Sequence, residues 1–477
     1  MNKIKMHPVL IFYGIRQFIF LLIIPLLRGL VYYLVNSSIY LWIKGSWIDI
    51  TTLMVIIWLS VIKWYNYNIY YDGDKIIISF GDFINEKILI KRKDISHIFV
   101  QMPFYLQFMN ALKIKINTFN EVDIPGAKNI ILSSNQLNKL NLINENKINN
   151  KFVNSNNLSL HATLYTAVLS LVMSNSFAGV LLASTFISAS GKLLGDQFKK
   201  EIYGSFTKIT KKLAFGFPPA GIAITYILIG GWCIAFIRNL ILYTNFSVKK
   251  KHNRLIIKSG IININKNYIH LNDVNYIDIV QNLFTKLSKV CSVFVSTKDA
   301  RNGEVVAITA ISKTLLDNNI NKLFNKNIKN LNRMNCIPQK TSFISYVYLP
   351  IFLFCATSLV LKLLINTYNN WKDFLVFIDL MVAIFFGWLT IIQIINFLTC
   401  GFAHQNNNFI IKCSKIFKFH TIIIPVNQVA KIEVNQSIIQ KYFSTCNVII
   451  HTNSKSKYCI KSIDFEKVKQ FLLNVNL

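Results

Sequence analysis

The chain has 477 residues, of which 53% are apolar and only 15% are charged. This composition excludes an ordinary soluble domain, in which about a quarter of the residues are charged. The 52 Lys and Arg residues outnumber the 21 Asp and Glu residues, which gives a net charge of +31. Such a charge is typical of proteins that contact nucleic acid or an anionic membrane surface, and the long apolar runs favour the membrane. We therefore expect anionic phospholipids, and no nucleic acid, as partners.

Six apolar segments are long enough to cross a membrane, since about 20 apolar residues span the hydrocarbon layer. They form three pairs: residues 11–35 with 48–64, 160–188 with 217–243, and 343–366 with 374–399. The basic N-terminus is followed by an apolar run without a small-residue cleavage site, so we interpret the first segment as a membrane span and not a signal peptide. A polar segment follows each pair.

The three polar segments resemble one another, and this internal repeat is the strongest pattern in the sequence. Each copy has two strand-like stretches whose outer ends are 23 residues apart: Ile95 and Thr118, Val274 and Thr297, Val429 and Thr452. Gly81 and Gly260 precede these stretches by 14 residues, whereas Ser414 precedes the third by 15. The strand register is therefore the least certain in the third copy.

Within each copy the pattern is that of β-strands. Apolar and polar residues alternate, as in Leu112 to Ile116, which predicts strands with one buried face. Asp72-Gly73-Asp74 and His252-Asn253 are suited to tight turns before the first long strand. A last strand follows the threonine in each copy, at residues 121–126, 304–312 and 457–464.

A helix is predicted to close each copy. Ser312 and Asp464 stand at the N-cap positions of the second and third closing helices, and the first falls in the Asn-rich segment 127–158 together with a linker. The sequence therefore predicts an α+β membrane protein in which each of three helix pairs precedes a small β-barrel or sandwich with a C-terminal helix. The helix pairs are residues 1–64, 151–243 and 331–399, and the β-rich domains are residues 65–150, 244–330 and 400–477.

The distribution of basic residues predicts the orientation in the membrane. Arg238 and Lys249 to Lys251 lie on the side of the β-rich domains, whereas loops 36–47 and 367–372 carry few basic residues. Because basic loops stay in the cytoplasm, we expect both termini and all three β-rich domains there. The basic loop 189–213, which this topology places outside, disagrees, and one interpretation is an amphipathic helix on the membrane surface.

An aromatic residue ends the second helix of each pair: Trp64, Tyr243 or Phe397. Such rings are common at headgroup depth, where they form an interfacial belt. Equally, these three side chains could simply pack within the apolar run. Both interpretations remain open at this point.

The pattern as a whole resembles the bacterial pleckstrin-homology (PH) domain membrane proteins of the second type, and among them the larger YdbT-like members with three repeats. The stretches that carry the resemblance are IIISFG and IIKSG, the strands that follow them, and LKIKINT, VFVST and VIIHT. The resemblance implies PH-like domains, no catalytic residues, no cofactor, and a smaller membrane protein of the same family with one PH-like unit as a partner. It also implies a link to envelope stress or to resistance against membrane-active peptides.

No motif points to catalysis. The sequence contains no GxxxxGK[ST], GxSxG or HExxH pattern. Cys413, His420, Cys446 and His451 lie close together in the sequence, but their spacing does not match a structural zinc site. We therefore expect neither an enzyme nor a metal protein.

Two basic clusters are candidates for binding lipid headgroups. Their members are Lys249, Lys250, Lys251 and Arg254 in one cluster and Lys91, Arg92 and Lys93 in the other. Each basic residue near an anionic leaflet contributes about 1 kcal/mol of attraction. General attraction to the membrane is favoured over a specific headgroup pocket, and positive-inside topology with a Lys-rich sequence is the alternative explanation of both clusters.

Charges inside spans are costly and so require a partner. Arg28 and Asp379 lie at similar depths in the first and last spans, and we hypothesise that they form an ion pair. Alternatively, Arg28 extends to the outer interface.

Two classes of function remain. The first is a non-enzymatic membrane scaffold whose PH-like domains bind a partner membrane protein at the inner leaflet. The second is a protein that binds or moves anionic phospholipids. A transporter is less favoured, because Asp379 is nearly the only acid within the spans.

Overall fold

A computed structural model defines the fold. It describes residues 2–18, 39–81, 85–118, 130–140, 219–251, 253–297, 304–324, 334–415, 417–453 and 456–474, with isolated residues between 26 and 30 and between 167 and 208. These residues form two compact units, one of residues 1–158, 182–203 and 256–268 and one of residues 159–181, 204–255 and 269–477. Each unit is described by itself.

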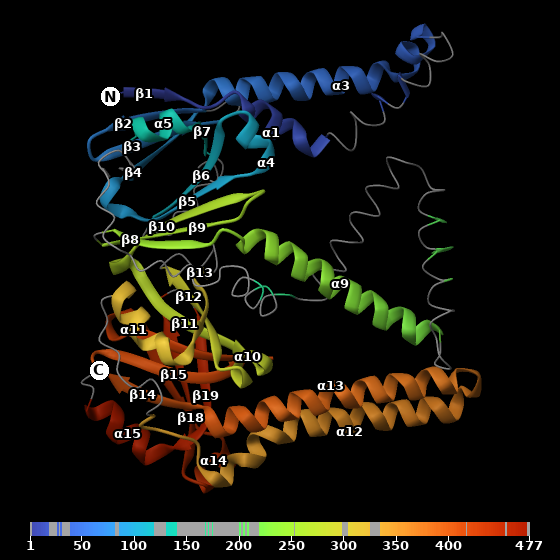
Figure 1. Cartoon of the computed structure of the whole chain (residues 1–477), viewed down its shortest axis with the longest axis vertical. Coiled ribbons are helices and arrows are strands. Elements are labelled where there is room, and N and C mark those ends of the chain that lie inside the picture. Colours follow the sequence, from blue (N-terminus) through green and yellow to red (C-terminus); the bar gives the residue numbers. More distant parts are fainter. Residues whose placement is uncertain are drawn as a thin grey trace. The chain divides into compact units, whose positions relative to one another are not determined.

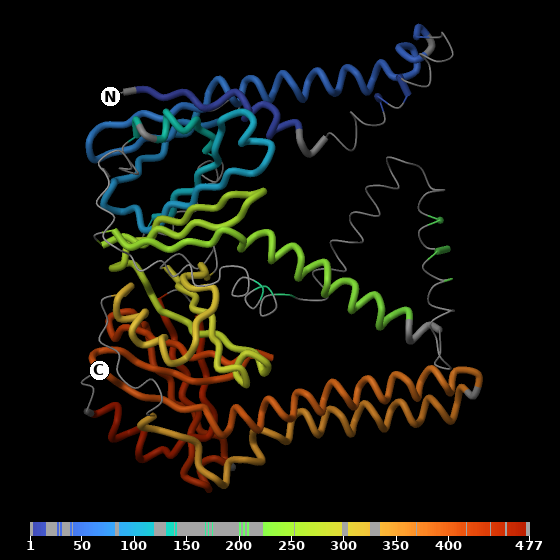
Figure 2. The backbone as a smooth tube through the Cα atoms, in the orientation of Figure 1, coloured from blue at the N-terminus to red at the C-terminus, as the bar shows by residue number. Residues whose placement is uncertain are grey.

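The first unit begins with an antiparallel sheet in the order β1-β2-β3-β4. Its strands are β1 (Asn2–Lys5), β2 (Asn68–Asp72), β3 (Lys75–Phe80) and β4 (Glu86–Lys91). The predicted tight turn is confirmed, because Asp72 pairs with Lys75 across Gly73 and Asp74. Helices α1 (Val9–Phe18) and α3 (Ile39–Asn66) lie between β1 and β2 in the chain and pack against each other (Figures 1 and 2).

A second sheet completes this unit. Its strands are β5 (Ile95–Met102), β6 (Ala111–Thr118), β7 (Ile130–Ser133), β9 (Arg254–Ser259) and β10 (Ile264–His270), in the order β7-β6-β5-β10-β9. Helix α4 (Phe104–Phe108) connects β5 to β6, and α5 (Ser134–Lys139) follows β7. Apolar side chains of both sheets, including Ile78 and Ile114, form one core together with Tyr268 of β10.

The second unit contains two sheets, β13-β12-β11-β16-β15-β14 and β17-β18-β19. The strands are β11 (Val274–Asn282), β12 (Val290–Thr297), β13 (Val305–Ser312), β14 (Gly401–Gln405), β15 (Asn408–Lys415), β16 (Lys418–Pro425), β17 (Val429–Asn435), β18 (Thr445–Thr452) and β19 (Lys457–Asp464), and β8 (Ser247–Lys251) precedes β9 in the chain. The helices are α9 (Pro219–Tyr243), α10 (Leu283–Leu287), α11 (Lys313–Phe324), α12 (Phe343–Thr367), α13 (Lys372–Thr399), α14 (Ile438–Tyr442) and α15 (Phe465–Asn474). Phe402, Phe409 and Val448 belong to the core between the two sheets, and Val468 of α15 joins it.

The repeated spacing of 23 residues has a simple structural cause. Ile95 pairs with Thr118, Val274 with Thr297, and Val429 with Thr452, so each pair closes one antiparallel hairpin. Each hairpin has a register shift directly after its first pair and a five-residue helix at its tip. A left-handed residue follows each helix, namely Asn110, Lys289 or Ser444. Insertions would shift this register and turn buried side chains outward, which explains the constant spacing.

The last strand of the first copy differs from the prediction. The predicted strand at 121–126 lies outside the described residues, and the strand that pairs with β6 is β7, within the segment expected to hold a helix and a linker. The closing helices themselves are confirmed as α5, α11 and α15. The Asp464 side chain accepts hydrogen bonds from the backbone N–H groups of Glu466 at 3.1 Å and Lys467 at 3.3 Å, as an N-cap should.

The third copy lacks the glycine because its hairpin is longer. Gly81 and Gly260 directly follow β3 and β9 and have φ values of 145° and 92°, which favour glycine. Ser414 instead lies inside β15 and pairs with Phe419. Serine is suited to this position because the backbone continues as a regular strand.

Four helices in the described part of the chain are long and apolar enough to cross a membrane: Trp42–Asn66, Ala223–Tyr243, Lys340–Thr367 and Lys372–Thr399. They correspond to four of the six predicted spans. The other two, 11–35 and 160–188, fall largely or wholly on residues that are not described, apart from α1. The arrangement of six spans in three pairs therefore stays a prediction, although α12 and α13 pack side by side along their length (Figure 1).

Each long helix that precedes a sheet passes almost directly into the first strand. One residue separates α3 from β2 and α13 from β14. The aromatic residue near each junction packs on neighbouring parts of the fold: Trp64 adjoins the first core and donates its indole N–H to the Met6 carbonyl at 2.9 Å, Tyr243 adjoins Val280, and Phe397 contacts Tyr346. Packing at the junction is therefore a role of all three rings.

Candidate functional site

Consecutive copies of the repeat share a sheet. In the second unit, β11 of the second copy pairs antiparallel with β16 of the third, so that Ile277 lies opposite Ile423 and Val280 opposite His420. In the first unit, β10 of the second copy lies beside β5 of the first copy. We call each such pairing a seam. The seams join the copies through the sheet ladder and not through side chains alone.

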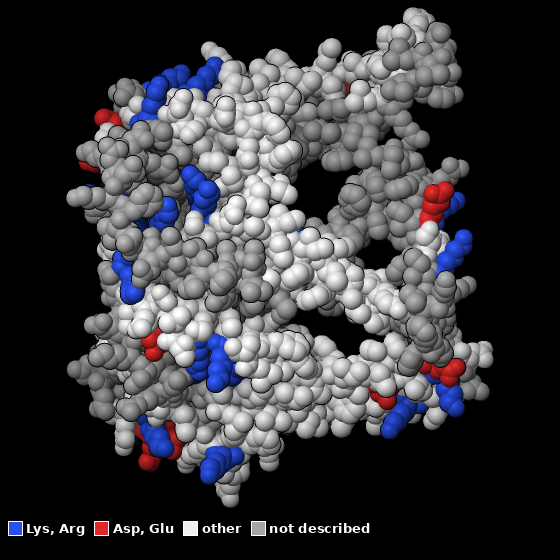
Figure 3. All heavy atoms as spheres, viewed as in Figure 1, with Lys and Arg blue, Asp and Glu red and all other residues white. Residues whose placement is uncertain are grey.

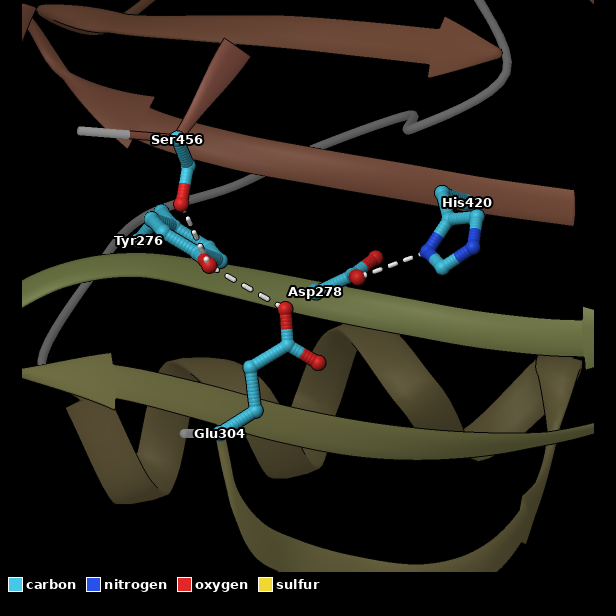
Figure 4. A network of polar contacts seen from close by, with 5 residues as sticks. All are labelled: Tyr276, Asp278, Glu304, His420 and Ser456. Carbon is cyan, nitrogen blue, oxygen red and sulfur yellow. Dashed lines mark hydrogen bonds and ion pairs between the residues drawn. The ribbon is translucent and has the colours of Figure 1, made fainter. Parts of the chain in front are cut away.

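Polar side chains meet at the β11–β16 seam, and two of them, Tyr276 and Asp278, are buried (Figure 4). The His420 Nδ1 atom lies 2.7 Å from Asp278 Oδ2, and the Asp278 side chain is 1% exposed. On the same strand, the Tyr276 hydroxyl contacts the Glu304 carboxylate at 3.1 Å and the Ser456 hydroxyl at 3.3 Å. Burial and the nearby Glu304 raise the pKa of Tyr276, so this group stays a neutral hydrogen-bonding phenol.

The β5–β10 seam has a comparable polar contact. His97 Nε2 lies 3.0 Å from Asn267 Oδ1, and both side chains are buried. The Gln107 side chain also donates to the Ile262 carbonyl at 2.9 Å. Each seam therefore contains a buried histidine contact that fixes which residues face one another, because an unpaired buried polar group would be costly.

A cavity of about 470 Å³ lies beside the β11–β16 seam. Its lining includes Lys286 of α10, Lys313 of α11, and Lys412 of β15, together with His420 and the end of α13 at Leu398 to Cys400. No Asp or Glu is among these lining residues. The cavity is thus a cationic hollow next to the end of a membrane helix.

The lysines of this cavity are held in unfavourable surroundings. Burial, with repulsion from the neighbouring lysines, lowers the pKa of Lys286 to about 8, and burial and Lys313 lower the pKa of Lys412 to about 8. Lys286 Nζ donates to Thr399 Oγ1 at 3.0 Å and lies 3.7 Å from the centre of the Phe419 ring. Among the described residues, no carboxylate forms an ion pair with any of the three lysines. The charges of Lys286 and Lys412 are therefore poorly compensated, whereas Lys313 is exposed and interacts with Asp317 of the same helix.

The basic residues singled out from the sequence lie elsewhere. Lys249, Lys250 and Lys251 are on β8, Arg254 begins β9, and Lys91, Arg92 and Lys93 lie at the end of β4 and on the turn that follows. Arg92 donates to the Leu140 carbonyl at 2.6 Å, and Lys250 donates to the Lys322 carbonyl at 2.7 Å. These two residues satisfy carbonyls near the ends of closing helices, and headgroup binding by the clusters stays a prediction.

The predicted intramembrane ion pair is not tested. Arg28 lies outside the described residues, whereas Asp379 lies within α13. Along α12 and α13 the visible face carries few charged side chains between the β-rich part and the far end of the helices (Figure 3). Asp379 is thus an isolated acid in an apolar helix.

The three cavity lysines left no signal in the sequence. They lie at positions 286, 313 and 412, far apart and on three different elements, so no cluster is visible before the chain folds. Side-chain packing between these three elements defines the cavity, so no local pattern in the sequence could have shown it.

The open edge of β17 is a candidate site in addition to the seams and the cavity. β17 corresponds to β5 and β11 in the repeat, but in the described part of the chain it has a strand neighbour only on the β18 side. The first seven residues of β11 are all buried, whereas β17 has no buried residue among its seven described positions. The difference is what the absence of a seam partner predicts.

Repeated β-modules attached directly to long apolar helices define a multi-pass membrane protein of modular construction. The family model of the bacterial PH domain matches residues 12–140, 205–319 and 356–476, which together make up well over half of the sequence. The chain therefore belongs to the bacterial PH domain family, with three repeats of the domain. No curated protein and no solved structure gives a significant match.

Proposed function

We propose that this protein is a non-enzymatic membrane scaffold whose free strand edge, β17, binds a partner membrane protein at the cytoplasmic face of the membrane. The partner would add the edge strand of its own PH-like module to the sheet. The observation that carries the proposal is the pair of internal seams, which use this same strand position in the first and second copies. Addition of a strand to an exposed sheet edge is a common mode of recognition.

The β11–β16 seam indicates the chemistry of the incoming strand. In the repeat, Ile432 and Glu433 of β17 correspond to Ile277 and Asp278 of β11. Ile277 faces Ile423, and Asp278 binds His420. The incoming strand should therefore place an apolar residue opposite Ile432 and a basic residue beside Glu433.

The chain's own β4 does not meet this requirement. In the repeat, Leu89 corresponds to Ile423, but Glu86 corresponds to His420. A second copy that docked its β4 on β17 would bring Glu86 beside Glu433, and like charges across neighbouring strands are destabilising. The proposal therefore commits to a different protein and not to self-association.

Photo-crosslinking of the full-length protein in its native membrane tests this function. A photoreactive residue at Asn435, which is exposed on β17, should crosslink to a PH-like module of another membrane protein, and peptide mapping should place the adduct in an edge strand. The control is the same probe at Lys457, which is exposed on β19, the opposite edge of the same sheet.

Glu433→Lys should weaken the adduct from position 435 several-fold, because it removes the acid that would face the incoming basic residue. Adducts only with lipid or with a second copy of the chain, or equal adducts from both probe positions, would overturn the proposal. An orientation with the β-modules in the cytoplasm is part of the proposal and rests on the distribution of basic residues.

A second candidate function is the binding of anionic phospholipid. The cationic cavity at the end of α13 favours it, and its ligand can be defined more closely.

A further inference from the structure

The cationic cavity of the second unit has no role in the docking of a partner strand. Its lysines come from three elements: Lys286 is on α10 at the tip of the second hairpin, Lys313 begins α11, and Lys412 is on β15 of the next copy. The seam brings these elements together, since β15 is the neighbour of β16, which pairs with β11. The site therefore exists only when the second and third copies are joined.

The electrostatics of the cavity favour an anion. Two half-buried ammonium groups with lowered pKa values face each other and Lys313, and no acidic residue is among the lining residues. Burial of a charge without a partner is costly, so an arrangement of like charges is expected where a ligand supplies the opposite charge. The thiols of Cys291, Cys400 and Cys413 line the cavity too, and burial keeps the pKa of Cys291 high, at about 12. These thiols therefore do not neutralise the lysines at pH 7.

The position of the cavity relates it to the membrane surface. Leu398, Thr399 and Cys400 line it, and Thr399 is the last residue of the apolar helix α13. The Leu398 side chain is 72% exposed, as expected for a residue that faces lipid at the end of a span. Lys286 contacts Thr399 directly, so its ammonium group lies beside the end of this apolar helix. If α13 crosses the membrane up to Thr399, headgroup phosphates lie at this depth.

We propose that Lys286, Lys313 and Lys412 form a binding site for a phosphate group that belongs to a small anionic headgroup or to a small soluble compound. Lysine ammonium groups are common ligands of phosphate, and each charge-assisted hydrogen bond is stronger than a neutral one. A volume of about 470 Å³ is within the usual range of small-molecule sites. The phosphate can belong to a lipid headgroup or to a soluble phosphate compound.

Binding measurements on the full-length protein in nanodiscs distinguish these sources. One arm compares nanodiscs of phosphatidylcholine alone with nanodiscs that contain phosphatidic acid or phosphatidylglycerol, and native mass spectrometry counts the retained lipids. The other arm adds inorganic phosphate and glycerol 3-phosphate to phosphatidylcholine nanodiscs and follows binding by calorimetry. Retention of an anionic lipid would identify the ligand as a lipid headgroup, and saturable binding of the soluble anions would identify it as a soluble phosphate compound.

The variant Lys286→Met/Lys412→Met tests the residues themselves. Methionine keeps an unbranched apolar side chain of similar length and removes a buried charge, so the fold should be preserved. We expect binding to fall about tenfold or more, since the variant removes two charge-assisted hydrogen bonds to the phosphate. Lys441→Met/Lys469→Met is the matched control, because it removes two exposed lysines that belong neither to the cavity nor to the two basic clusters.

The proposal fails if neither arm shows binding above that of phosphatidylcholine alone. It also fails if the cavity variant and the Lys441→Met/Lys469→Met control lose binding equally, because the attraction would then be the general charge of the surface. Crosslinking at β17 is independent of both results, so the scaffold function and the phosphate site can succeed or fail separately.

Discussion

Lys412 shows how one residue can contribute to function at the expense of stability. Its side chain is half-buried on β15, and its pKa of about 8 lies below the value of about 10.5 expected in an unfolded chain. Below pH 8 the folded protein must hold the charged form in poor surroundings. A residue kept under such conditions is characteristic of a binding site.

We expect Lys412→Met to stabilise the ligand-free protein at pH 7. The thermal midpoint should rise by about 2–4 °C, the shift that 1 kcal/mol causes in a domain of about this size. Between pH 8 and 10.5 the unfolded wild-type chain binds more protons than the folded one, so the stability of the wild type rises with pH. The advantage of the variant should therefore shrink by pH 9.5.

Thermal unfolding in detergent at pH 7 and pH 9.5 measures this effect. Lys91→Met, at an exposed position, is the control and should change the midpoint little at either pH. A variant that is less stable than the wild type at pH 7 would show that Lys412 is already compensated by another group.

Asp278 and Glu433 occupy the same position in two copies but have different surroundings. Asp278 is 1% exposed and contacts His420 from the neighbouring copy. Glu433 is partly exposed, and hydrogen bonds from Lys431 and His451 lower its pKa. The same sequence position is therefore a buried seam contact in one copy and a surface acid at the open edge in the other.

At the scale of elements, α1 and α3 approach each other through small residues. A Cβ atom placed on Gly14 would lie 2.7 Å from the Ser60 hydroxyl and 3.3 Å from the Ser60 Cβ atom, so the serine would have to move to make room for it. Close approach of helices through Gly and Ser is typical of packing inside membranes. The glycine therefore allows the first helix to lie against the second.

Gly14→Leu should disrupt this helix contact. We expect a loss of about 1–3 kcal/mol, the usual cost of overpacking, visible as a lower thermal midpoint or as protease sensitivity of the N-terminal helices. Gly45→Leu is the matched control, because nothing lies within 4 Å of a Cβ at that glycine of α3. Equal effects of the two substitutions would contradict a specific contact at Gly14.

Much of each copy could be predicted at this scale. The hairpin register follows from the spacing between Ile95 and Thr118 and its equivalents, and Asp464 marks the start of the last helix. The strand β7 was missed because residues 130–132 are a short apolar run beside an Asn-rich stretch, and three apolar residues alone do not distinguish a strand from the start of a helix. Local patterns therefore fixed the hairpins better than the connections between them.

At the scale of the whole molecule, the seams could not be predicted. β11 and β16 are separated by more than a hundred residues and two membrane helices, and pairing over such a distance leaves no local periodicity. The residue pattern of β11 and of β16 is also that of an ordinary buried strand. For the same reason Lys286 and Lys412 could not be recognised as neighbours, so the cationic cavity was missed.

The orientation of the β-modules can be tested with the native cysteines. Cys459 is exposed on β19, and Asn370, between α12 and α13, is exposed at the other end of the helix pair. If the modules are cytoplasmic, a membrane-impermeant maleimide should label Cys459 only after the membrane is opened, whereas it should label an Asn370→Cys variant from outside. The reverse pattern would contradict a cytoplasmic location.

The short junction between helix and strand has a mechanical consequence. When a bilayer becomes thinner, a membrane helix reduces the mismatch by tilting. Because only Cys400 separates α13 from β14, no linker can absorb that rotation before it reaches the sheet. β14 belongs to the same sheet as the β11–β16 seam, and Thr399 lines the cavity beside it. A change in bilayer thickness that tilts α13 would thus rotate the sheet together with the helix.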